Sequence, residues 1–232
     1  VGGPRLFNEL VIILKESDPR PALVRMAELD LLKYLHPTLG FDTKAGAQFE
    51  AASRAIHWYE LLYTGQPCER WLVYFLCLTA ALDADAVAGM TARLSIPGRY
   101  HALLGEQRED GRALLRKFER RRDRNNNPLP SEIRAWLHPL GTELRLALMA
   151  LSESDAVKRW ISLYFTQLRE VAPLLDGKDL AALGLAPGPA YKEVRQALLD
   201  ARLNGKVVTR EEEEQLVRKR FLRPGRKSSP GN

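Results

Sequence analysis

Apolar residues recur every three or four positions along most of the chain, as in Leu10, Ile13 and Leu14 near its start and Leu144 and Leu148 further on. This spacing places them on one face of an α-helix, whereas the strict alternation typical of a half-buried strand is hard to find over five or more residues. The sequence therefore predicts an all-α fold with no sheet, an irregular multi-helix bundle of roughly ten to twelve helices.

Proline and glycine mark where these helices begin and end, because proline removes a backbone donor and glycine leaves the helical conformation easily. The expected helices cover residues 4–16, 20–35, 44–64, 67–82, 84–94, 98–124, 131–137, 140–151, 153–172, 178–183, 189–204 and 209–221. No fixed repeat of about 34 or 40 residues is present, which argues against a helical repeat array. We expect a domain boundary at the Asn-rich run around residue 125, dividing residues 1–125 from 126–222, and a disordered basic tail at 223–232.

Charge is unevenly distributed along the chain. Thirty-five Lys and Arg face 29 Asp and Glu, a formal net charge of +6, and the sequence pI is about 9.4. Residues 1–100 carry a net charge of −1 and residues 101–232 a net charge of +7. A basic second half favours a polyanionic partner.

The two cysteines, Cys68 and Cys77, lie in an apolar segment without the paired spacing of a disulfide framework or a zinc site, which favours a reducing, cytoplasmic location. The longest apolar run, Trp71 to Leu82, is too short for the roughly 20 residues of a membrane span and predicts a buried helix instead. Because the chain starts at Val1 rather than Met, we expect it to be part of a longer protein.

Catalytic motifs are scarce. Asp83 and Asp85 have the spacing of a metal-binding pair, but they follow a helical segment rather than a strand, so we expect one of them to cap the next helix. The four histidines are scattered, and no glycine-rich phosphate loop or nucleophile elbow occurs. The sequence therefore predicts no catalytic residue, no metal site and no cofactor in this chain.

The densest cationic run lies at the end of the helix expected over 98–124. Six positive charges stand there against Glu119 and Asp123: Arg116, Lys117, Arg120, Arg121, Arg122 and Arg124. Cations near a helix C-terminus are favoured by the helix dipole, but clustered arginines also suit a phosphate backbone. Contact with RNA and a solvated charged face remain alternatives at this point.

A second cationic region lies near the C-terminus. It comprises Arg195, Arg202, Lys206, Arg210, Arg218, Lys219 and Arg220. The acidic run Glu211–Glu214 follows Thr209, a residue type that caps helices, so the run is interpreted as N-terminal helix capping. The four tryptophans, Trp58 among them, lie in apolar periodic segments and are expected to be core anchors rather than stacking platforms.

Several segments resemble one known family. Residues 3–10, GPRLFNEL, with Arg5 and Glu9 four apart on one helix face, resemble the neck-helix motif of class II tRNA nucleotidyltransferases and bacterial poly(A) polymerases. Residues 175–180, 183–185 and 187–189, followed by 201–205 and 209–212, are similar to the tail of that family. Residues 69–76, ERWLVYFL, look like the branch of long bacterial A-adding or poly(A) polymerase-like proteins, which carry DHH and CBS domains upstream.

The resemblance implies that residues 1–125 are the neck and body helices and residues 126–222 a second body part and the tail. In the family, a catalytic head carries the metal-binding carboxylates upstream of the neck motif, and the body and tail hold tRNA. Arg5 and Glu9 would brace the nucleotide-binding pocket of that missing head. Mg²⁺ and ATP, with CTP as an alternative nucleotide, are implied for the parent enzyme, and no turnover is expected from this chain alone.

The leading hypothesis is thus an RNA-binding helical region of a template-independent nucleotidyltransferase, of the CCA-adding, A-adding or poly(A)-adding type. Its partners would be tRNA or another RNA 3′ end and the head domain of the same polypeptide, with no membrane. The alternative is a helical protein-interaction scaffold or homodimer that does not bind RNA. A third hypothesis, an independent enzyme, needs Asp83 and Asp85 as metal ligands.

Overall fold

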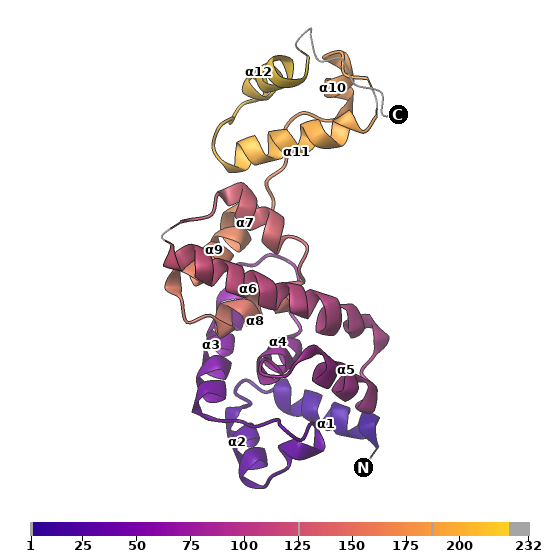
Figure 1. Ribbon diagram of the computed structural model, residues 1–232, viewed down its shortest axis with the longest axis vertical. Coiled ribbons are helices and arrows are strands. Elements are labelled where there is room, and N and C mark those ends of the chain that lie inside the picture. The colour runs from indigo at the N-terminus through magenta and orange to yellow at the C-terminus, as the bar shows by residue number, and fades with distance from the viewer. Residues whose placement is uncertain (1, 125, 187, 223–232) are drawn as a thin grey trace. The chain divides into compact units, whose positions relative to one another are not determined.

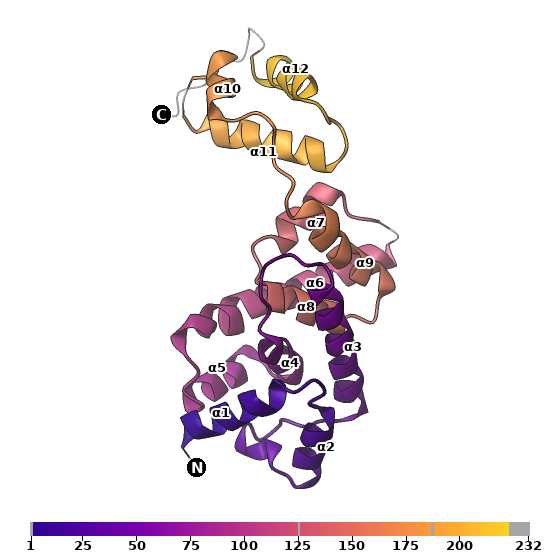
Figure 2. The same cartoon turned by 180° about the vertical axis from the view of Figure 1, so that it is seen from behind.

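The computed structural model describes residues 2–124, 126–186 and 188–222 (Figures 1 and 2). In these ranges the chain forms twelve α-helices and no strand, which confirms the all-α prediction. The helices are α1 (Gly3–Leu14), α2 (Arg20–Glu28), α3 (Thr43–Glu60), α4 (Arg70–Leu78), α5 (Ala84–Arg93), α6 (Arg108–Asp123), α7 (Pro130–Leu137), α8 (Thr142–Leu151), α9 (Asp155–Leu163), α10 (Gly177–Ala182), α11 (Ala190–Leu203) and α12 (Arg210–Phe221). The tail expected at 223–232 lies outside the described residues.

The chain divides into two compact units. The first comprises Val1–Asn127 and Trp136–Ser162, and the second comprises Pro128–Ala135 and Leu163–Asn232. The domain boundary expected near residue 125 stays a prediction. Within the described ranges, no helix combines the length and the apolar composition needed to cross a membrane.

The core of the first unit is built around α4. Every residue from Trp71 to Leu78 is buried, so this helix has no solvent-facing side. It packs against α1, α3 and α8, and both views show it inside the group formed by these helices, α5 and α6 (Figures 1 and 2). Phe7 of α1 and Tyr100 meet the Trp71 ring edge-on, at centroid distances of 5.6 and 5.0 Å.

Two buried arginines stabilise helix C-termini, whose last carbonyl groups have no partner within the helix. The Arg108 guanidinium donates to the carbonyl oxygens of Thr79 and Leu82, at 2.7 and 2.6 Å, just beyond α4. Arg145 Nε donates to the carbonyl oxygen of Leu137 at 2.8 Å, at the end of α7. Burial lowers the pKa of Arg108 from its usual value. Arg108 and Arg145 therefore stabilise the fold and do not add to the surface charge.

Several expected helices are shorter than their patterns indicate, among them those expected over 20–35, 67–82 and 153–172. The helix predicted over 20–35 ends at Glu28, because Asp30 adopts a left-handed conformation with φ of 56°. The Leu31 amide then donates back to the carbonyl oxygen of Met26, at 2.8 Å, the arrangement known as the Schellman motif. Glycine usually occupies the left-handed position, so an aspartate there gives little warning in the sequence.

The same motif closes α5 at Ser95, with φ of 53°, and closes α10 and α11 at Gly184 and Gly205. The first residue of α1, Gly3, packs closely against the last residue of α5, Arg93. A Cβ atom at Gly3 would lie 1.9 Å from the carbonyl oxygen of Arg93, so only glycine allows this approach.

The second unit has its own apolar core, formed by residues of α10, α11, α12 and the segments that precede α10 and α11. The buried members are Leu175, Leu180, Leu185, Val194, Leu198 and Val217. Asp176 caps α10 and Thr209 caps α12, each in a capping box with the residue three positions later, Asp179 or Glu212. The cap interpretation of Thr209 is thereby confirmed.

Candidate nucleic-acid interface

The cationic run of α6 does not form one uniform patch. Phe118 is fully buried and turns its side of the helix towards the core. Arg116, Arg120 and Arg124 are exposed and four residues apart, so they follow one another along the opposite side, with a rise of about 6 Å between successive members. We call these three residues the α6 arginine row. Within the described residues no member of the row makes an ion pair.

Lys117 and Arg121 lie on a flank of α6 and pack on the Trp136 ring. Lys117 Nζ is 3.6 Å and the Arg121 guanidinium carbon is 5.5 Å from the ring centroid. Arg121 also donates to the side-chain oxygen of Asn126 at 3.2 Å. Cation–π contacts of this kind hold both side chains in defined positions, so these residues contribute to folding as well as to the surface charge.

Arg122 is held by its neighbour. Its Nε and Nη2 atoms donate to a carboxylate oxygen of Asp123, at 2.9 and 2.6 Å. Both side chains are partly exposed, and surface pairs of this type contribute little to stability. The structure thus assigns the six predicted α6 residues to three settings: an exposed row, an aromatic-packed flank and a locally neutralised arginine.

In the second unit, Arg195 lies beside a cavity of about 580 Å³ formed by α7, α10, α11 and residues 171–173. Arg134 and Lys192 line the same cavity. Tyr191 also lines it, packs against the core of the second unit and donates to the carbonyl oxygen of Leu185, at 3.1 Å. Sequence reasoning named only Arg195. Arg134 was missed because it stands alone in the sequence, far from the basic runs.

Arg202 has a structural role that its position in a basic region conceals. Its Nη1 atom is 3.2 Å from a carboxylate oxygen of Glu213, a side chain with no exposed area, and it also donates to the carbonyl oxygen of Val208. Glu213 also accepts hydrogen bonds from the backbone amides of Leu174 and Leu175. The acidic run is therefore more than helix capping, because its third member is a buried anchor of the second unit.

Arg210 is also paired. It forms ion pairs with Asp179 and with Glu214, the latter at 3.7 Å. Asp179 accepts from the Asp176 amide and from Arg210, which together hold the pKa of its carboxyl below the usual value. The pairing with Asp179 raises the pKa of Arg210 in turn.

The other predicted cations of the second unit are exposed. Lys206 lies between α11 and α12, and the last turn of α12 presents Arg218, Lys219 and Arg220, with the Arg220 guanidinium 5.3 Å from the Phe221 ring centroid. The structure therefore leaves Arg195, Lys206 and the end of α12 as the accessible basic positions of this unit.

The remaining candidates lie on the first unit. Arg5 and Glu9 are exposed on the same side of α1. The Asp83 side chain accepts from the Ala86 amide at 2.8 Å and caps α5, as expected, and Asp85 stands in the first turn of that helix. Over the described ranges, no three His, Cys, Asp or Glu side chains are grouped so that they could hold a metal ion.

The described residues are thus all-helical, with exposed arginines on α6 and at the end of α12. Residues 1–41 match the family described as "Probable RNA and SrmB-binding site of polymerase A". The chain is 40% identical over 213 residues to an A-adding tRNA nucleotidyltransferase of Geobacter sulfurreducens, and 23% identical over 227 residues to one of Halalkalibacterium halodurans. These alignments cover 92% and 95% of this chain but 24% and 47% of the relatives.

Solved structures show the same fold. A Thermotoga maritima CCA-adding enzyme complexed with tRNA has a TM-score of 0.75 at 20% identity, over 94% of this chain and 51% of that one. A CCA-adding enzyme solved with ATP has a TM-score of 0.71 at 20% identity, over 99% and 53%. Together these findings support a body domain like that of tRNA nucleotidyltransferases and poly(A) polymerases, in agreement with the resemblance seen in the sequence.

Proposed function

We propose that this chain binds tRNA as the body and tail of a template-independent nucleotidyltransferase. The observation that carries the proposal is the 40% identity to an A-adding tRNA nucleotidyltransferase over 92% of the chain. The exposed α6 arginine row provides a surface suited to it, because unpaired guanidinium groups contact phosphates without first breaking an ion pair. The accessible cations of the second unit add a further phosphate-binding surface.

Recognition of this kind depends on backbone charge and shape. The exposed aromatic side chains Tyr34 and Tyr63 belong to neither cationic region, so the basic surfaces favour phosphate contacts over base readout. The chemistry of nucleotide addition belongs to an upstream head in the same polypeptide, which would bind Mg²⁺ and ATP or CTP. A cytoplasmic location is part of the same proposal.

The test is the salt dependence of tRNA binding, measured by fluorescence anisotropy over a series of KCl concentrations. Each neutralised phosphate contributes about 0.7–0.9 to the slope of log K against log salt. Replacing Arg116, Arg120 and Arg124 together by Gln should reduce that slope by about 2–3 and weaken binding at every salt concentration. Arg121 is left in place because its substitution would also disturb Trp136.

The matched control neutralises two exposed basic residues of the first unit that lie outside α6 and outside residues 1–41: Lys44 and Arg93. The control should keep the slope of the unmodified chain. A chain that shows no salt-dependent tRNA binding would refute the proposal. A chain that forms a dimer in light scattering and ignores tRNA would favour the scaffold function instead.

A further inference from the structure

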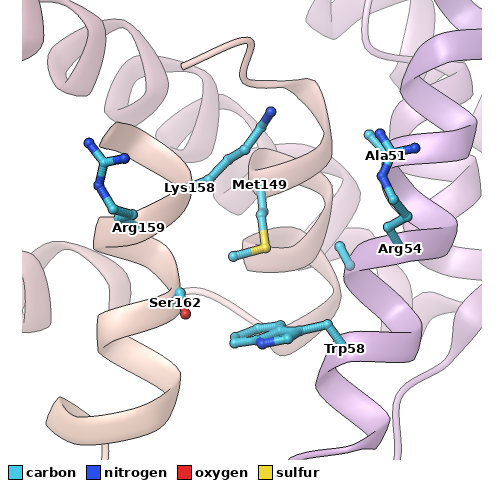
Figure 3. A pocket seen from close by; sticks show the side chains of 8 residues that line it. Ala51, Arg54, Trp58, Met149, Lys158, Arg159 and Ser162 are labelled. Carbon is cyan, nitrogen blue, oxygen red and sulfur yellow. The ribbon is translucent and has the colours of Figure 1, made fainter. Parts of the chain in front are cut away.

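A cavity of about 320 Å³ lies in the first unit between α3, α8 and α9 (Figure 3). Its volume is at the lower end of the range for small-molecule sites. Helix α3 contributes one face, with Ala51, Ala55 and Trp58 at the three- and four-residue spacing of a single helical side. Small alanine side chains leave room above the tryptophan ring.

The two ends of the cavity differ in chemistry. Figure 3 shows the Trp58 ring at one end, with the thioether of Met149 pointing into the space beside it. The Lys158 ammonium and the guanidinium groups of Arg54 and Arg159 lie towards the other end, on either side of the opening between the helices. An aromatic surface and three cations therefore line one small space.

The three cations differ in whether they already form ion pairs within the protein. Arg54 is paired with Glu50 at 2.5 Å, and Lys158 Nζ is 3.6 Å from an Asp155 carboxylate oxygen. Arg159 is exposed and makes no ion pair among the described residues. An anionic ligand would therefore meet Arg159 first, and the cavity retains a net positive charge after the two pairs are counted.

We infer that this cavity binds one unpaired nucleotide of the RNA, with the base stacked on Trp58 against Met149 and the phosphate held by Arg159 and Lys158. A planar aromatic group joined to an anion is the ligand class that matches both ends. Bases stack on tryptophan without regard to sequence, and an unpaired base is free to leave its own strand. The inference rests on the proposed function for its RNA source, but the pocket chemistry is testable separately.

The first experiment follows the Trp58 indole N–H signal by NMR, identified by its absence in the Trp58→Phe variant of the full chain. AMP should move this signal. Adenosine, which lacks the phosphate, and ribose 5-phosphate, which lacks the base, should each bind more weakly than AMP. The inference would be overturned if AMP did not move the signal. It would also be overturned if adenosine or ribose 5-phosphate bound as tightly as AMP.

Substitutions test the aromatic end and the cationic end of the cavity separately. Trp58→Leu should weaken AMP binding by at least about fivefold, the lower range for loss of base stacking, while Trp58→Phe should retain part of the affinity. Arg159→Gln should weaken AMP binding and leave the weak adenosine binding unchanged. Tyr34→Leu and Lys44→Gln, exposed residues outside the cavity, are the matched controls. Equal affinity of all these variants would contradict the site.

Binding experiments with RNA show whether the cavity takes a nucleotide of an RNA strand or a free nucleotide. Single-stranded hexa-adenylate should move the Trp58 signal, whereas a blunt RNA duplex should not, because its bases are already stacked. Response to AMP but not to hexa-adenylate would assign the cavity to free nucleotides and overturn the RNA part. If tRNA binds with salt dependence but no nucleotide moves Trp58, only this inference fails. If AMP moves Trp58 but tRNA does not bind, only the proposed function fails.

Discussion

Removing the buried carboxylate of Glu213 should unfold the second unit more readily and leave the first unit unaffected. Glu213 has no exposed area, and its two oxygens accept from the amides of Leu174 and Leu175 at 2.9–3.1 Å. The same carboxylate lies 3.2 Å from Arg202, whose side chain is 21% exposed. One residue of α12 therefore fixes both the segment before α10 and a cation of α11.

The expected loss of stability follows from the hydrogen-bond and ion-pair partners that Glu213→Ala leaves unsatisfied. In Glu213→Ala, the buried amide of Leu175 and the partly buried amide of Leu174 lose their acceptor, and an unsatisfied buried donor costs about 1–3 kcal/mol. Arg202 also loses its partner, and removing one member of a buried ion pair typically costs about 3–5 kcal/mol. We expect a loss of about 3–5 kcal/mol in total, because these terms overlap. Glu213→Gln keeps one acceptor oxygen and should lose about 1–2 kcal/mol.

Urea unfolding can report on each unit by itself. All four tryptophans of the chain, Trp58, Trp71, Trp136 and Trp160, belong to the first unit, so their fluorescence follows that unit, whereas far-UV circular dichroism follows both. Glu213→Ala should shift part of the circular dichroism transition to lower urea while the fluorescence transition stays in place. Glu211→Gln, an exposed neighbour on the same helix, is the control and should cost less than about 1 kcal/mol. A Glu213→Ala variant within about 0.5 kcal/mol of the unmodified chain would refute the reasoning.

Three further predictions concern the first unit. Ser95→Gly should stabilise it by about 1 kcal/mol in thermal unfolding, because glycine adopts the φ of 53° without steric cost, and an unchanged or lower midpoint would contradict the assigned geometry. Gly3→Ala should destabilise it by about 1–3 kcal/mol, since the added methyl would overlap the Arg93 carbonyl, and urea unfolding followed by fluorescence checks this. Burial raises the pKa of both thiols, Cys68 and Cys77, from 9.0 to about 12. Iodoacetamide should therefore label Cys77, the buried thiol, slowly in the folded chain at pH 8, and stability should fall as the pH rises from 9 towards 12, because both thiols ionise first in the unfolded chain. Rapid labelling under native conditions would count against this burial.

The helical content of the chain was predictable because its signals are local. The three- and four-residue spacing of apolar positions, with proline and glycine between segments, gives helix positions directly. The overestimate at 20–35 arose because Asp30 takes a backbone conformation usually reserved for glycine. The division of the chain into two compact units depends on contacts between distant segments, which periodicity does not record.

The candidate interface was predictable as a set of charges but not as an arrangement. The run from Arg116 to Arg124 reads as one patch, and only the burial of Phe118 shows which arginines share an exposed side. Arg202 looks like a surface cation because its partner, Glu213, sits in an acidic run that suggests helix capping. The interpretation of Trp58 as a core anchor overlooked the cavity beside it, which exists only where α3, α8 and α9 meet.

The complete burial of α4 has a consequence for the chain during its synthesis. Helices α1 and α3 precede it, but α8, which covers much of its remaining surface, ends about 70 residues later. At a translation rate of about 5–20 residues per second, that interval lasts roughly 4–14 seconds. For this time an apolar helix emerges from the ribosome with one side uncovered, so residues 70–78 are where a nascent-chain chaperone would be needed most.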